Sequence, residues 1–93
     1  MDVRDDYALL GGLRFHYRDW GGDLPPLVLL HGFTGHARTW DRFAAAMRDR
    51  YRVLALDQRG HGESAWAEDY RVEAMADDLE RFATALGLDR FAL

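Results

Sequence analysis

Two short stretches of the sequence combine the residue types that could do chemistry. His31-Gly32 follows directly on the apolar residues 27–30, and residues 57–64, DQRGHGES, follow the apolar residues 53–56. Glycines at such points permit a tight backbone path that leaves N–H groups free of a strand ladder. In a crevice from which water is excluded, free N–H groups can stabilise a developing oxyanion. The first stretch is therefore a candidate oxyanion-binding loop.

The elements before these stretches are predicted by hydrophobic spacing. Residues 7–10 and 13–18 favour strands, and the Gly11-Gly12 pair between them suits the tight turn of a hairpin. Residues 27–30 show no alternation of apolar and polar side chains, as expected of a parallel strand buried on both faces. The first third of the chain thus predicts a hairpin followed by a central strand.

The rest of the chain alternates helices with strands. Apolar spacings of three and four over residues 40–47 predict a helix with Thr39 as its N-cap. Residues 52–56 predict a strand, residues 72–86 a longer helix ended by Gly87, and residues 91–93 the start of another strand. Strands and helices in this order predict an α/β fold, with a largely parallel sheet and one helix on each face. In open sheets of this kind ligands bind beyond the carboxyl ends of the strands.

The chain length, net charge and composition exclude several classes of function. The 93 residues allow one domain at most, and the net charge of -4 offers no basic face for a nucleic acid. The absence of cysteine removes disulfides, thiolate catalysis and cysteine metal sites. No apolar run approaches the ~20 residues that span a bilayer, and the charged N-terminus does not resemble a signal peptide. We therefore expect a cytoplasmic protein with no nucleic-acid or membrane partner.

The sequence resembles the α/β-hydrolase family over essentially the whole chain. The resemblance is carried by four motifs, LVLLHGFTG (27–35), TWD (39–41), VLALDQRGHGES (53–64) and LGLDRFAL (86–93). In that family the loop after the His-Gly strand supplies one N–H of the oxyanion hole. The resemblance assigns this donor to the backbone of Phe33 and places His31, Gly32 and Thr34 at the substrate. It implies that His31 holds the loop by hydrogen bonding and transfers no proton.

The resemblance also shows what the sequence lacks. The family's nucleophile stands on a G-x-S-x-G elbow, and its acid and histidine come later in the chain. The only serine here, Ser64, lies in GHGES, which reads G-x-G-x-S. We therefore expect residues 1–93 to be a truncated domain, inactive alone, that the missing C-terminal part completes. The implied activity is hydrolysis of a carboxylic ester, a small-molecule substrate, through a serine beyond this chain, with no cofactor and no metal.

Several alternatives stay open within the same fold. HGFTG and TW also resemble the lyase 2-succinyl-6-hydroxy-2,4-cyclohexadiene-1-carboxylate synthase. Dehalogenases and epoxide hydrolases of the family often carry proline where this sequence has Thr34. The chain could also be a catalytically inert fragment.

Other residues have a structural and a functional interpretation. Gly60-x-Gly62-x-x-Ala65 matches a loose dinucleotide-binding pattern, which requires a helix opening at its last position. Asp57 and Arg59 are expected to stabilise the turn as a pair, and His61 with Ser64 to be turn residues rather than a catalytic pair. A metal site built from the histidines and Asp57 lacks the usual ligand spacing.

Overall fold

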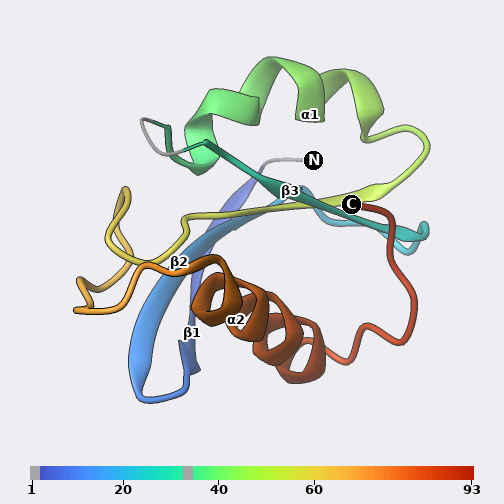
Figure 1. Cartoon of the computed structure of the whole chain (residues 1–93). Helices are drawn as coiled ribbons and strands as arrows, with labels where there is room; N and C mark the ends of the chain where they lie inside the picture. Colours follow the sequence, from blue (N-terminus) through green and yellow to red (C-terminus); the bar gives the residue numbers. More distant parts are fainter. Residues whose placement is uncertain (1–2, 33–34) are drawn as a thin grey trace.

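A mixed sheet of four strands forms the centre of the protein in a computed structural model that describes residues 3–32 and 35–93. The strands are β1 (Arg4–Leu10), β2 (Leu13–Asp19), β3 (Pro26–Leu30) and β4 (Arg52–Leu56). Their spatial order is β1-β2-β4-β3 (Figure 1). The predicted α/β fold is confirmed.

The hairpin turns where the sequence predicts. Gly11 and Gly12 have φ angles of 58° and 84°, which a residue with a Cβ rarely adopts, and they join the antiparallel strands β1 and β2. β2 then pairs antiparallel with β4. Among the described strands only β3 and β4 pair in parallel, so the sheet is more mixed than the expected largely parallel one.

The register of β3 against β4 decides where the two chemistry-bearing stretches lie. Leu30 is opposite Leu56, so both strands end at the same level. His31 and Asp57, the next residues, therefore leave the sheet side by side at its carboxyl edge. On the other side of β3, Ala92 accepts a hydrogen bond from Val28 N–H and donates one to Pro26 C=O, at 2.9 and 3.0 Å. The strand predicted at residues 91–93 thus begins beside β3.

Helices cover both faces of the sheet (Figure 1). A 3-10 turn, η1 (Ala37–Trp40), leads into α1 (Asp41–Met47) on one face, and α2 (Val72–Ala85) covers the other. The prediction of Thr39 as N-cap is wrong, because the chain turns three residues earlier and His36 caps η1. Gly87 follows α2 with a φ angle of 70°, as predicted for the residue that ends this helix.

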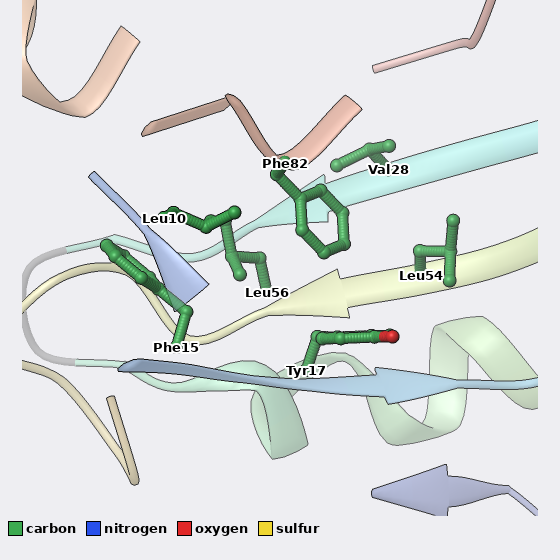
Figure 2. Packing of buried hydrophobic residues seen from close by; sticks show 7 residues of the cluster. All are labelled: Leu10, Phe15, Tyr17, Val28, Leu54, Leu56 and Phe82. Carbon is green, nitrogen blue, oxygen red and sulfur yellow. The ribbon is translucent and has the colours of Figure 1, made fainter. Parts of the chain in front are cut away.

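The core has two parts, one on each face of the sheet. Figure 2 shows the part under α2, made of Leu10, Phe15, Tyr17, Val28, Leu54, Leu56 and Phe82. The part under α1 contains Trp20, Leu27, Leu29, Ala37, Ala44, Val53 and Ala55. Successive residues of β3 and β4 alternate between the two parts, so both strands are buried on both faces. None of the described helices is long and apolar enough to cross a membrane.

Candidate active site at the carboxyl edge of the sheet

His31 joins the loop after β3 to the loop after β4. Its side chain is buried, and its Nε2 accepts the backbone N–H of Gln58 at 3.0 Å. Its Nδ1 must then carry the proton, and it lies 2.6 Å from the carbonyl oxygen of Gly32. Burial lowers the pKa of His31, and the nearby His61 adds to this, against the opposing effect of the Gly32 carbonyl. His31 is therefore a neutral imidazole that holds two loops together.

Gln58 completes this connection and helps to shape a crevice. Its side-chain amide donates to the carbonyl of His31 at 2.6 Å, so the two residues bond to each other twice. Beside them lies a crevice of about 220 Å³ lined by His31, Gly32, Gln58, His61 and Met75. The rings of His31 and His61 pack on each other, with their centroids 4.9 Å apart. The predicted binding edge is thus a real hollow at the end of β3 and β4.

Asp57 is the buried anion of this edge. Its Oδ1 accepts the N–H of Ala37 at 2.6 Å, and its Oδ2 accepts the N–H of Glu63 at 2.9 Å and lies 2.6 Å from Nδ1 of His16. Burial by itself would raise the pKa of Asp57, but the two N–H groups and His16 bring it below the ordinary value. An ionised carboxylate thus ties β2, η1 and the loop after β4 together.

Glycine is required where this carboxylate meets the loop. Gly62 has a φ angle of 52°, and a Cβ at that position would overlap the Asp57 carboxyl group. The loop backbone can approach Asp57 closely only because residue 62 has no side chain. The same glycine belongs to the loose dinucleotide pattern, yet α2 opens at Val72, well past Ala65. The glycines therefore shape a loop around a carboxylate, and the dinucleotide interpretation lacks its helix.

The side chain of Ser64 forms hydrogen bonds with backbone groups. Its Oγ donates to the carbonyl of Asp57 at 2.6 Å and accepts the N–H of His16 at 2.9 Å, and the residue is 4% exposed. His61 Nδ1 lies 2.9 Å from the carbonyl of Arg59. As predicted, Ser64 and His61 are turn residues, joined through the N–H of Ser64 and the carbonyl of His61.

Arg59 corrects one prediction. It was expected to pair with Asp57, but its guanidinium instead bonds both oxygens of the buried Asp78 on α2, at 2.7 and 2.8 Å. A third bond goes to the carbonyl of Asp69. The two charged residues of the motif thus stabilise the loop separately, because Asp57 points toward the sheet and Arg59 toward α2.

His16 is a residue of this site that was not predicted from the sequence. It lies on β2, is buried, and places both ring nitrogens against carboxylates, Asp57 on one side and Asp5 on the other. Its only signal in the sequence is a polar alternation, Arg14, His16 and Arg18, which is typical of a strand face turned to solvent. Among the described residues, no three His, Asp or Glu side chains are grouped as metal ligands would be.

The comparisons with known proteins fit this geometry. The family model of the α/β hydrolase fold matches residues 25–93. The chain belongs to the α/β-hydrolase fold family. The resemblance stated from the sequence is thereby confirmed.

Three relatives show the range of this family. N-formylmaleamate deformylase of Pseudomonas putida is 39% identical over 84 residues, which are 88% of this chain and 31% of the relative. Epoxide hydrolase 4 of Mus musculus is 38% identical over 86 residues, 88% of this chain and 24% of the relative. The solved structure of a membrane phospholipase A, described as a bacterial virulence factor, has a TM-score of 0.91 and 33% identity, over 96% of this chain and 30% of that one. The chain thus spans less than a third of the length of these relatives.

The structure describes two of the four predicted site residues of this α/β-hydrolase chain. His31 and Gly32 line the crevice, and His31 makes the loop-holding hydrogen bonds expected of it. Phe33 and Thr34 lie outside the described residues. The assignment of the oxyanion donor to Phe33, and of substrate contact to His31, Gly32 and Thr34, stays a prediction.

Proposed function

We propose that this chain is the N-terminal part of an α/β-fold hydrolase that cleaves a carboxylic ester through a serine nucleophile beyond residue 93. One observation carries the proposal. His31 and Gln58 lock the loops after β3 and β4 together around a crevice at the carboxyl edge of the sheet. Ligands of open α/β sheets bind at this edge. Relatives that include a deformylase and a phospholipase A support hydrolysis of an acyl bond.

In this proposal the chain supplies part of the site. The backbone N–H of Phe33 donates to the oxyanion of the tetrahedral intermediate, while His31, Gly32 and Thr34 border the substrate. The nucleophile, the acid and the base come from the C-terminal part, and water is the second substrate. A single oxyanion donor is worth on the order of 10²–10³ in kcat.

The backbone donor can be tested by removing one N–H. In the polypeptide that the gene encodes in full, Phe33→Pro deletes the donor, while Phe33→Ala deletes the ring and keeps the donor. We expect p-nitrophenyl acetate turnover to fall by on the order of 10²–10³ in the proline variant, and by much less in the alanine variant. Equal losses in both variants would remove the Phe33 assignment.

The nucleophile can be tested separately. A serine-directed fluorophosphonate should label the full gene product, and the isolated residues 1–93 should show neither labelling nor ester turnover above an inert protein. Ser64→Ala is the matched control, because this buried serine holds the backbone. Turnover by the isolated chain that Ser64→Ala abolishes would overturn the proposal.

Epoxide hydrolysis is a second candidate. Its support is that mouse epoxide hydrolase 4 is as similar to this chain as the deformylase is. Opening of an epoxide by an aspartate nucleophile would leave the same N-terminal part in place. A full gene product that opens an aryl epoxide and resists the fluorophosphonate would favour this candidate over the serine esterase.

A further inference from the structure

His16 lies between two carboxylates. It is a residue of β2, 1% exposed, on the face of the sheet that η1 covers. Its Nδ1 is 2.6 Å from Oδ2 of Asp57, and its Nε2 is 2.8 Å from Oδ1 of Asp5 on β1. Contacts this short between a ring nitrogen and a carboxylate oxygen require a proton between the two atoms.

The two contacts need more protons than a neutral histidine can supply. A neutral imidazole has one N–H donor and one acceptor nitrogen, and an ionised carboxylate only accepts. A neutral His16 would therefore turn a lone pair toward one of the two carboxylates. Either His16 carries a proton on both nitrogens, or one carboxyl group carries the missing proton.

Both carboxyl groups favour the ionised form. Burial would raise the pKa of Asp57, yet the N–H groups of Ala37 and Glu63, together with His16, bring it below its ordinary value. For Asp5 burial also acts upward and is outweighed by His16, Arg18 and Arg38, so its pKa is lowered too. Two of the bonds to Asp57 come from backbone and do not depend on His16. The protons therefore belong to the histidine.

The surroundings of this cluster carry more negative than positive charge. Three carboxylates approach the ring or its partners, those of Asp5, Asp57 and Glu63, the last at 3.7 Å from Nε2. Arg18 and Arg38 pair with Asp5, Arg18 also pairs with Asp41 at 3.1 Å, and the ring of Tyr7 packs on His16. The carboxylates therefore outnumber the guanidinium groups, and a positive charge on His16 reduces the excess of negative charge.

We propose that His16 is a doubly protonated positioning residue that holds the Asp57 carboxylate in place and, through Asp57, sets the position of the loop after β3. The link is short. Nδ1–H of His16 meets Oδ2 of Asp57, and Oδ1 of the same carboxylate receives the N–H of Ala37 at 2.6 Å. Ala37 is fully buried and directly follows the loop.

The arrangement ties the position of this loop to the two N–H donors of His16. A ring that lacked either donor would turn a lone pair toward Asp57 or Asp5, and the Ala37 N–H would lose its fixed acceptor. That the loop carries an oxyanion donor rests on the proposed function, but the charge state of His16 and its connection to Ala37 do not.

Nuclear magnetic resonance of the full gene product tests the charge state directly. At neutral pH we expect both ring nitrogens of His16 to carry protons, with the resonances assigned by their loss in a His16→Asn variant. A His16 ring with one bare nitrogen at neutral pH would overturn the proposal.

Two isosteric variants test the connection. The amide of asparagine can occupy the place of Nδ1 and keep the bond to Asp57, while that of glutamine reaches the place of Nε2 and keeps only the bond to Asp5. We expect His16→Gln to displace the Ala37 amide resonance and His16→Asn to leave it nearer the wild-type position. An unchanged Ala37 resonance in His16→Gln would contradict a positioning role. Should either variant fail to fold, the protonation of the wild-type His16 ring at neutral pH still decides.

An activity measurement separates the two proposals. In an active full gene product, His16→Gln should lower kcat by on the order of tenfold or more, with KM changed little, because a misplaced donor weakens the transition state. The exposed Arg42→Gln on α1 is the control. A full gene product with no esterase activity would contradict the proposed function. The protonation of the His16 ring and the position of the Ala37 resonance would still test the role of His16 independently.

Discussion

The carboxyl edge of the sheet and the open flank of β3 are stabilised in opposite ways. At the carboxyl edge the buried polar side chains of His16, His31, Asp57 and Ser64 all find partners within residues 3–32 and 35–93. Along the flank of β3 an apolar groove of about 300 Å³ runs between β3, Trp40, Phe43 and Leu93. There Leu93 is 70% exposed and Phe43 46% exposed.

The difference follows from what each kind of surface demands. A buried polar group costs free energy until it is hydrogen-bonded, so a polar network is stable only when it closes on itself. An apolar surface needs only to be covered, and any apolar partner of suitable shape can do so. We therefore propose that the carboxyl edge is built by this chain alone, while the flank of β3 is completed by the C-terminal part.

The largest expected effect concerns the whole chain. Residues 1–93 expressed alone should aggregate or be partly molten, because an uncovered strand edge and apolar groove invite intermolecular pairing. At ~25 cal/mol per Å², a few hundred Å² of wet apolar surface costs several kcal/mol out of a total stability of ~5–15 kcal/mol. Co-expression of the C-terminal part should restore a soluble species. Size exclusion and thermal melting check this, and a monomer that melts sharply by itself would refute it.

Removal of the Asp57 side chain should lower the stability of the protein by nearly as much. Asp57→Ala leaves the N–H groups of Ala37 and Glu63 and the ring of His16 without their shared acceptor. We expect the free energy of unfolding of the full gene product to fall by about 3–5 kcal/mol, the range for breaking a buried ionic network. Urea unfolding measures the change. The exposed Asp77→Ala should leave the midpoint where it is, and a loss of under ~1 kcal/mol in Asp57→Ala would mean that the edge does not depend on this carboxylate.

Acid should weaken the carboxyl edge by a smaller amount. The pKa values of Asp5 and Asp57 are both lowered from the ordinary value of 3.8. Their stabilisation is therefore complete above about pH 4 and is lost as the pH falls through the folded-state values. We expect a drop in the urea midpoint below pH 4. Asp57→Asn should flatten this dependence, and a dependence as steep as in the wild type would assign it to the other carboxylates.

The smallest expected effect is that of a change at Phe43, for which Phe82 on the opposite face is the contrast. Phe82 of α2 is fully buried, whereas Phe43 of α1 borders the open groove. In the isolated chain Phe43→Ser should raise the soluble fraction modestly, since it removes exposed apolar surface. Phe82→Ser should lower it, because core truncation of this kind costs about 3–5 kcal/mol. Soluble yield and light scattering measure both. Equal losses in the two variants would show that Phe43 is already a core residue.

Local structure could be predicted well where one segment decides it. The hairpin at Gly11-Gly12 needs positive φ angles, and the end of α2 at Gly87 needs the same freedom. Residues 27–30 show their burial on both faces directly in their composition. The N-cap could not be predicted in this way. The N–H of Ala37 is drawn to Asp57, 20 residues away in sequence, and the chain turns at His36 rather than at Thr39.

The sequence by itself determined the order of the elements, the α/β class and the family, because these depend on hydrophobic spacing and on glycines at turns. It also determined that the two polar stretches follow neighbouring strands. Only the tertiary structure decided which polar side chains meet. His16 and Asp57 are 41 residues apart, and on β2 the polar alternation reads as a solvent face. The ring of His16 is buried because η1 packs over that face, and no local pattern encodes that packing.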